Sequence, residues 1–115
     1  MRSILFISLL LTAMLISAPI PLPEHPRPDF QRENWLNLNG DWSFEFDAKN
    51  AGVAENWQSP RKSFSKTITV PFPWGSELSG LEDEAVIGWY QRTLQIPPEW
   101  QGERIFIIVG AADWH

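Results

Sequence analysis

The densest cluster of ionisable side chains in this 115-residue chain is a run of three carboxylates, Glu82, Asp83 and Glu84. Two carboxylates can divide acid and base or nucleophilic work between them when a fold holds them about 5 to 9.5 Å apart. Adjacent residues in a flexible loop do not hold that geometry. We therefore interpret the run as solvated charge, and we predict no catalytic residue in this chain.

The histidines and serines add no further reactive site. His25 lies among prolines and His115 is the last residue, so neither has the neighbours that a metal site or a catalytic base requires. The sequence also lacks a glycine-rich phosphate-binding motif and a serine in a nucleophile motif. We predict no metal ion and no cofactor.

Tryptophans and neighbouring carboxylates remain as groups that can bind a ligand. Asp113 directly precedes Trp114, and a carboxylate beside an aromatic plane can bind a sugar hydroxyl and a sugar ring face together. The same aspartate can simply turn the chain at the end of a strand. Trp74 and Trp89 bracket a long loop and can either stack on a ligand or pack in the core. The sequence does not decide between these uses.

The elements that must position these groups are β-strands. Residues 89–96 alternate with the period of two that is typical of a strand, and Pro97 and Pro98 end the run. Residues 104–109, RIFIIV, are apolar on both faces, which predicts a strand covered on both sides. The two segments together predict a pair of strands joined by a proline turn.

Two earlier strands are predicted from similar signals. The aromatic residues at positions 42, 44 and 46 alternate with polar ones, which predicts a half-buried strand with its aromatic face inward. Residues 67–70 predict a short strand that Pro71 ends. Between them, residues 47–66 predict a polar surface excursion with one helical turn near residues 53–57.

These elements predict an all-β fold. No helix of ordinary length is predicted after the first 18 residues, and residues 72–88 predict a long loop. Four short strands fit half of a β-sandwich or jelly roll, that is, a partial jelly roll. Half a jelly roll leaves an open sheet, so the uncharged, β-branched residues 105–109 would form an unpaired edge that is prone to aggregation.

Composition excludes several classes of protein. The formal net charge is −5, and the nine basic residues are scattered, so nucleic-acid binding has no electrostatic support. Cysteine is absent, so stability must come from burial alone, and the seven tryptophans and seven phenylalanines supply the volume for it. Four tryptophans are assigned to the core or its rim: Trp35, Trp42, Trp57 and Trp100.

The first residues have the pattern of a targeting segment. Arg2 precedes an apolar run that ends in Ser17-Ala18, which predicts a signal peptide over residues 1–18 and export to the periplasm or beyond. An uncleaved anchor remains an alternative, because Pro19 disfavours cleavage after Ala18. Residues 19–30 carry five prolines and predict an extended linker. Residues 31–115 are then the domain, with no membrane contact once the leader is removed.

Three blocks of this sequence resemble the N-terminal sugar-binding domain of glycoside hydrolase family 2, the group of β-galactosidases and β-glucuronidases. They are LNLNGDWSFEFD at residues 36–47, ITVPFPW at residues 68–74 and WYQRTLQIPPEWQGERIFIIVGAADW at residues 89–114. The resemblance covers nearly everything after about residue 30. It implies a jelly roll like those of galactose-binding domains.

The resemblance also implies a glycosidase that hydrolyses O-glycosidic bonds with retention. Its two catalytic glutamates would come from a (β/α)8 barrel that this chain does not contain, so the chain alone is expected to be inactive. In such enzymes a loop of the first domain reaches toward the substrate, which makes Trp74, Glu77 and Trp89, together with Asp113, the candidate substrate contacts. The expected partners are a carbohydrate and downstream immunoglobulin-like and barrel domains.

Two other functions fit the same residues. A stand-alone carbohydrate-binding module would need a complete sandwich and an exposed aromatic platform. A purely structural or interaction domain would use the two-faced apolar segment at residues 104–109. We expect an N-terminal fragment of the larger enzyme, because the chain stops one residue after the third block. The branches of the family share these blocks, so the sugar is not predicted.

Overall fold

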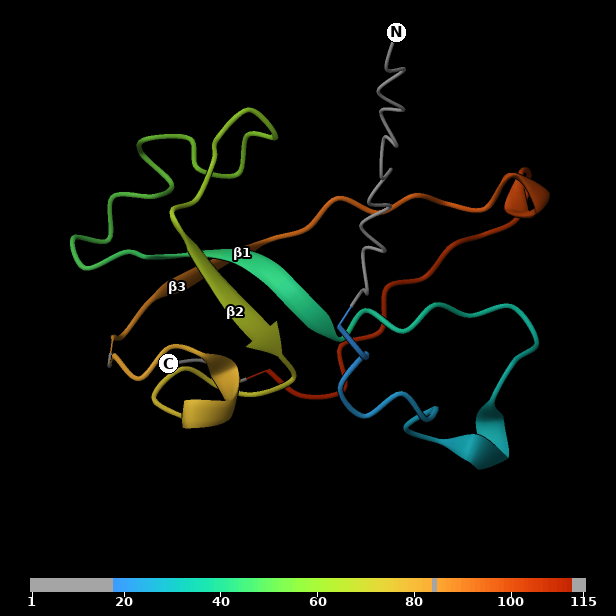
Figure 1. The fold of residues 1–115 in the computed structure, drawn as a ribbon. Coiled ribbons are helices and arrows are strands. Elements are labelled where there is room, and N and C mark those ends of the chain that lie inside the picture. The colour runs from blue at the N-terminus through green and yellow to red at the C-terminus, as the bar shows by residue number, and fades with distance from the viewer. Residues whose placement is uncertain (1–17, 84, 113–115) are drawn as a thin grey trace, which may run out of the picture.

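The computed structural model describes residues 18–83 and 85–112 of the chain. Three antiparallel strands form one sheet in the order β2-β1-β3, with β1 (Gly40–Phe46) between β2 (Lys66–Val70) and β3 (Gly88–Gln91) (Figure 1). The described residues also form three single-turn 3-10 helices: η1 (Pro28–Phe30) precedes β1, η2 (Glu77–Ser79) lies between β2 and β3, and η3 (Pro98–Trp100) follows β3. No α-helix occurs among the described residues, which agrees with the predicted all-β class.

The central strand β1 carries the core. Phe44 is fully buried, and it lies opposite Tyr90 of β3 in the ladder. Ile68 of β2 is also fully buried, and Leu81 from the loop after η2 completes the cluster. Apolar side chains that pack around these three are only partly buried: Trp42, Phe46, Val70 and Trp74. The predicted inward aromatic face of this strand is therefore confirmed, on one face of the sheet.

The predicted short strand at residues 67–70 is also confirmed. β2 begins one residue earlier, at Lys66, and ends at Val70 immediately before Pro71. Proline has no backbone N–H to donate to the ladder, so the pairing stops there. The loop that follows is ordered by the Gly75 N–H, which donates to the Leu81 carbonyl at 2.7 Å, and by Ser79, which is fully buried.

Gly88 allows Phe44 to lie over the first residue of β3. A Cβ atom at Gly88 would stand 2.5 Å from Phe44 Cζ and 3.0 Å from Trp74 Cζ3. We expect Gly88→Ala to lower the free energy of unfolding by about 1 to 3 kcal/mol, because packed rings must shift to admit the methyl group. Urea unfolding followed by tryptophan fluorescence measures the change.

Gly110→Ala is the matched control for this substitution. A Cβ atom at Gly110 meets nothing within 4 Å, so its urea midpoint should stay at the wild-type value. Equal midpoints for the Gly88 and Gly110 variants would show that the close approach of Phe44 carries no energetic weight.

The predicted strand over residues 89–96 is shorter in the structure. The ladder ends at Gln91, and residues 92–97 belong to no strand. β3 is an edge strand with β1 as its neighbour in the described sheet, so nothing on its other side prolongs the pairing. The Arg92 side chain turns instead to the chain before β1, where Nη1 donates to the carbonyls of Leu38 and Asn39 at 2.7 and 3.0 Å.

The predicted strand at residues 104–109 is wrong for the structure described here, whereas the predicted exposure of residues 105–109 is confirmed. These residues belong to no strand and are exposed, with Ile107 and Ile108 at 71% and 85% of their full accessibility. Apolar sequence alone does not create a strand, because backbone groups and side chains both need a neighbour. The described chain supplies none at this segment, which we call the apolar ribbon.

Two other expectations have a mixed outcome. Residues 52–58 form hydrogen-bonded turns rather than a helix, although the Glu55 N–H donates to the Ala51 carbonyl at 2.9 Å. The predicted linker contacts the domain: the side-chain amide of Asn37 donates to the Leu22 carbonyl at 3.0 Å, and that of Asn39 donates to the Pro21 carbonyl at 3.0 Å. The predicted leader lies outside the described residues except for Ala18.

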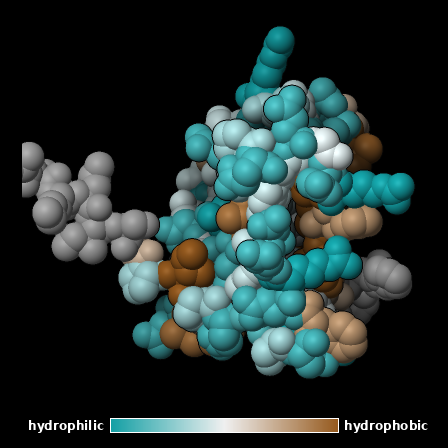
Figure 2. Space-filling model, turned by 90° about the vertical axis from the view of Figure 1, so that its right-hand side faces the viewer, coloured by the Kyte–Doolittle hydropathy of each residue, from teal (hydrophilic) through white to brown (hydrophobic). Residues whose placement is uncertain are grey.

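Within the described part of the chain, no helix is long and apolar enough to cross a membrane. The face shown in Figure 2 is mostly hydrophilic, and apolar side chains interrupt it. The exposed large apolar residues include all of the ribbon from Ile105 to Val109.

Candidate functional site

Trp74 lies on the apolar face of the sheet. Its ring centroid is 5.7 Å from that of Phe44, 6.2 Å from that of Tyr90 and 6.4 Å from that of Phe46. The side chain is half-buried, because one side of the indole covers the core. Core packing therefore covers much of the Trp74 ring, which was predicted from the sequence as a substrate contact. Burial also raises the pKa of the neighbouring Tyr90 hydroxyl.

Trp89 lies on the opposite face of the sheet, because it alternates with Tyr90 along β3. Its indole N–H donates to Asp47 Oδ2 at 3.1 Å, and its ring meets Trp57 edge-on at 6.0 Å between centroids. The structure thus separates the two tryptophans that bracket the long loop. One β-sheet lies between them, and a single small ligand cannot contact both.

Asp47 is the polar centre of the Trp89 face, a role that was not predicted from the sequence. Only 4% of the residue is exposed. Its carboxylate accepts hydrogen bonds from the backbone N–H groups of Ala51 and Gly52, each at 2.8 Å, and from the Trp89 indole. Burial alone raises the pKa of Asp47, but these hydrogen bonds outweigh burial and hold the pKa below its ordinary value. The signal in the sequence is an aspartate at a strand end, followed by a glycine five residues later.

Two predicted substrate contacts remain, Glu77 and Asp113. Glu77 is exposed in η2, and Asp113 lies outside the described residues. Glu82 and Asp83 are exposed, and Asp83 pairs with Lys66 at 3.7 Å between Oδ2 and Nζ, which agrees with their interpretation as solvated charge. Glu84 lies outside the described residues. The assignment of substrate contact to Trp74, Glu77, Trp89 and Asp113 stays a prediction.

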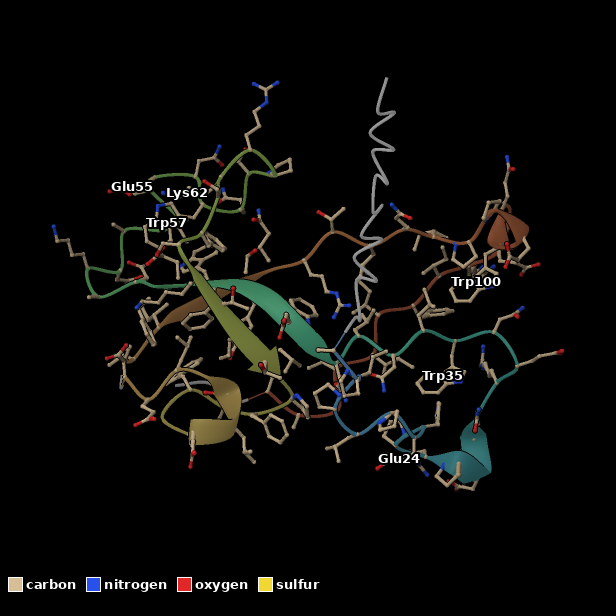
Figure 3. All side chains as sticks on the ribbon, in the orientation of Figure 1. Glu24, Trp35, Glu55, Trp57, Lys62 and Trp100 are labelled. Carbon is tan, nitrogen blue, oxygen red and sulfur yellow. The ribbon has the colours of Figure 1, made fainter. Side chains whose placement is uncertain are left out.

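Trp57 forms an aromatic site that the sequence assigned only to the core or rim. The ammonium of Lys62 lies 4.7 Å from the centroid of its ring, and its indole N–H donates to Glu55 Oε2 at 2.9 Å. Phe64 packs beside it at 6.1 Å between centroids. Figure 3 shows Glu55, Trp57 and Lys62 together at one end of the molecule, with Trp35 and Trp100 toward the other end.

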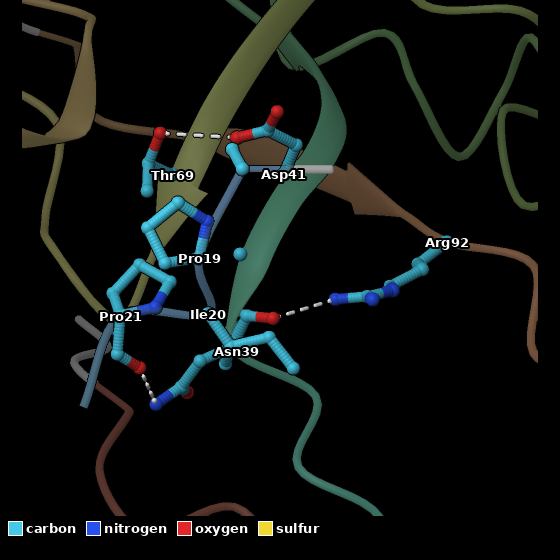
Figure 4. Close-up of a pocket in the computed structure, with 9 residues that line it drawn as sticks. Pro19, Ile20, Pro21, Asn39, Asp41, Thr69 and Arg92 are labelled. Atoms are coloured by element: carbon cyan, nitrogen blue, oxygen red, sulfur yellow. Dashed lines mark hydrogen bonds between the residues drawn. The ribbon is translucent and has the colours of Figure 1, made fainter. Parts of the chain in front are cut away.

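A cavity of about 330 Å³ opens where the start of β1 and the end of β2 meet the proline-rich segment. Figure 4 shows Asp41 and Thr69 on one side of it and Arg92 on another. The Thr69 hydroxyl donates to Asp41 Oδ1 at 3.2 Å. Pro19, Ile20 and Pro21 supply apolar walls. Polar and apolar side chains therefore both line this cavity.

Metal binding finds no support in the part of the chain that the structure describes. No three histidine or carboxylate side chains lie close enough together there to hold a metal ion.

Comparison with known proteins relates the chain to a glycosidase. It is 30% identical over 83 residues to a β-glucuronidase of Paenibacillus borealis, an alignment that includes 69% of this chain. The chain spans about 14% of the length of that relative. No protein-family model matches the chain. The similarity indicates a glycoside hydrolase relationship. The part of the chain that the structure describes is an open antiparallel sheet.

Proposed function

We propose that this chain is the N-terminal sugar-binding domain fragment of an exported glycoside hydrolase of family 2. The observation that carries the proposal is the 30% identity to a β-glucuronidase over 69% of this chain. The chain spans about 14% of the length of that relative. The three sequence blocks at residues 36–47, 68–74 and 89–114 support the same assignment. The complete enzyme would hydrolyse O-glycosidic bonds, and its catalytic carboxylates would come from a barrel domain.

The open sheet supports a domain that is completed by further strands. The described chain leaves residues 105–109 exposed, although five consecutive apolar residues are typical of buried strands. In the proposed enzyme these residues pack within a full jelly roll or against the downstream immunoglobulin-like and barrel domains. The apolar ribbon is then an internal surface of the larger protein.

Export is proposed from the first 18 residues. Arg2, the apolar run and Ser17-Ala18 have the order of a signal peptide. The mature protein would act on its carbohydrate in the periplasm or outside the cell, without a cofactor.

The proposal is tested by the size and activity of the native protein. An antibody raised against this chain should capture a species many times heavier than its 13.2 kDa, and the captured species should hydrolyse 4-nitrophenyl glycosides. The purified 115-residue chain should hydrolyse none of them, because the proposal places the catalytic carboxylates in a barrel domain.

A stand-alone carbohydrate-binding module is the second candidate. The half-buried Trp57, with Glu55 and Lys62 at its edge and face, is the observation that favours it. A native species of about 13 kDa that binds oligosaccharides and hydrolyses no glycoside would support the module and contradict the enzyme.

A further inference from the structure

Two asparagine side chains fasten the proline-rich segment, residues 19–30, to the chain just before β1. The side-chain amide of Asn39 donates to the Pro21 carbonyl at 3.0 Å (Figure 4) and to the Leu22 carbonyl at 3.4 Å. The side-chain amide of Asn37 donates to the same Leu22 carbonyl at 3.0 Å. The attachment of the segment therefore depends on amide N–H donors, most of all on those of Asn39.

The attached segment contains a strained backbone at Leu22. Its φ angle is 47°, in the left-handed region that residues with a side chain rarely adopt. Both asparagine side chains donate to the carbonyl of this same residue. These hydrogen bonds offset the strain, so removal of the Asn39 donors should allow Leu22 to relax and the segment to leave the domain.

Asn39 is also the asparagine of this chain with the most reactive neighbour. Asparagine is a thermolabile residue, because the backbone nitrogen of the next residue can attack its side-chain carbonyl carbon. Glycine obstructs this attack least, since it has no side chain, and Gly40 follows Asn39. The larger residues tryptophan, leucine, alanine and tryptophan follow the other asparagines, which are Asn34, Asn37, Asn50 and Asn56.

The backbone itself requires glycine at this position. Gly40 has a φ angle of 108°, a conformation that is strained for any residue with a side chain. The geometry at the start of β1 therefore maintains the residue that makes Asn39 reactive.

Solvent has access to this pair of residues. Asn39 and Gly40 are half-buried, and both line the cavity of about 330 Å³ beside the proline-rich segment. A cavity of that volume has room for several water molecules, each of which occupies about 30 Å³ in the liquid. Water is the reactant that deamidation of an asparagine consumes.

We propose that Asn39 is a site of spontaneous deamidation and that its product releases the proline-rich segment from the domain. In the first step the backbone nitrogen of Gly40 bonds to Cγ of Asn39 and ammonia leaves, which closes a five-membered imide ring. Water then opens the ring and gives aspartate or isoaspartate. The net reaction consumes one water, liberates one ammonia and needs no other reactant.

Release follows from the exchange of a hydrogen-bond donor for an acceptor. The amide of Asn39 donates to two carbonyl oxygens, whereas an ionised carboxylate has no N–H to donate. Its negative charge would also repel the oxygens of Pro21 and Leu22. Because the ammonia is lost to solvent, the reaction does not reverse and the segment stays released.

Peptide mapping by mass spectrometry tests the reaction in the full wild-type chain during incubation in mildly alkaline buffer. We expect Asn39 to deamidate about tenfold faster or more than any of the other four asparagines, with isoaspartate among its products. Asn50 and Asn56 are exposed and provide the internal comparison. Deamidation of Asn39 at no higher rate than these two would overturn the proposal.

The full chain with Asn39→Asp carries the aspartate product and tests the release. Relaxation of the backbone amides of Ile20 and Leu22, measured by NMR, should show greater mobility than in wild type. Asn56→Asp makes the same change at an exposed residue and should leave both amides as in wild type. Wild-type mobility of Ile20 and Leu22 in the Asn39 variant would show that the proposed release does not occur.

Two further measurements keep the test decisive if the aspartate variant does not fold. Asn39→Ala removes the donors without adding a charge and should also mobilise Ile20 and Leu22. The same relaxation measurement on wild type after incubation should show mobile amides in proportion to the deamidated fraction. Neither measurement uses a sugar or a glycosidase assay, so both outcomes are independent of the proposed function.

Discussion

A Phe44→Ala chain should lose most of its folded population. Phe44 is fully buried, and its ring lies 4.8 Å from that of Phe46 and 4.9 Å from that of Tyr90 between centroids. Removing a buried phenylalanine ring lowers the free energy of unfolding by about 3 to 5 kcal/mol, through lost transfer energy and the cavity left behind. A core of this size supplies only about 3 to 5 kcal/mol in total. One substitution is therefore comparable with the whole stability of the sheet.

Near-ultraviolet circular dichroism and urea unfolding of the full chain measure this loss. Phe106→Ala provides the control, because Phe106 has the same side chain but is 68% exposed in the apolar ribbon. Its unfolding curve should stay within about 0.5 kcal/mol of wild type. If the Phe44 variant kept the wild-type spectrum and midpoint, the cluster around β1 would not be the core of the protein.

The second large effect is expected for Asp47→Asn, and it should depend on pH. The carboxylate of Asp47 accepts from the N–H groups of Ala51 and Gly52 and from the Trp89 indole. An asparagine has one oxygen and turns an NH2 group toward some of these donors, which leaves buried N–H groups without acceptors. We expect a marked fall in the free energy of unfolding at neutral pH and a loss of the Trp57–Trp89 contact.

The direction of the pH dependence follows from the pKa of Asp47. Burial raises this pKa, but hydrogen bonds from the N–H groups of Ala51 and Gly52 and from Trp89 outweigh burial, so it lies below the ordinary value of 3.8 in the folded chain. A carboxyl whose pKa is lowered by folding stabilises the fold above its unfolded pKa, and this stabilisation is lost as pH falls through the folded pKa. Wild type should therefore lose stability more steeply than Asp47→Asn below about pH 4.

Urea unfolding at a series of pH values checks this expectation. Asp29→Asn is the control, because Asp29 is exposed and its pair with Arg27 spans 3.8 Å at the surface. Part of the acid sensitivity should survive in the Asp47 variant, since hydrogen bonds from Ser65 lower the pKa of Glu45 as well. Identical pH profiles for wild type and Asp47→Asn would show that Asp47 does not stabilise the fold through its charge.

The two strands that the sequence predicted best are those with a strong local signal. The aromatic alternation at residues 42, 44 and 46 places three rings on one face of β1, and Pro71 ends β2 for a local reason. The strand signal at residues 89–96 gave the position of β3 but not its end. Pairing stops at Gln91 because a ladder needs a neighbouring backbone, which local alternation does not reveal.

The apolar ribbon at residues 104–109 shows the same limit more clearly. Its composition predicts burial, and the described chain leaves it exposed. Burial depends on which other atoms lie nearby, and the described residues supply no strand beside it. The similarity to a much longer β-glucuronidase supports the proposal that this segment packs inside a larger protein.

The candidate site was the least predictable feature. Trp74 and Trp89 flank one loop in the sequence, yet the sheet places them on opposite faces, because Trp89 occupies an outward position in β3 while Trp74 folds over Phe44. Asp41 and Arg92 are 51 residues apart in the sequence and share no motif, but both line one cavity.

The sequence by itself determined the all-β class, the positions of β1, β2 and β3 and the resemblance to a glycosidase domain. Alternation, prolines and glycines act on the few residues around them, so these features can be read locally. The tertiary structure alone decided the buried partners of Asp47, the separation of the two tryptophans and the meeting of Asp41 with Arg92 at one cavity. Each of these features depends on strand register and on contacts between distant segments. The same local elements are compatible with many different arrangements, so local patterns do not determine these contacts.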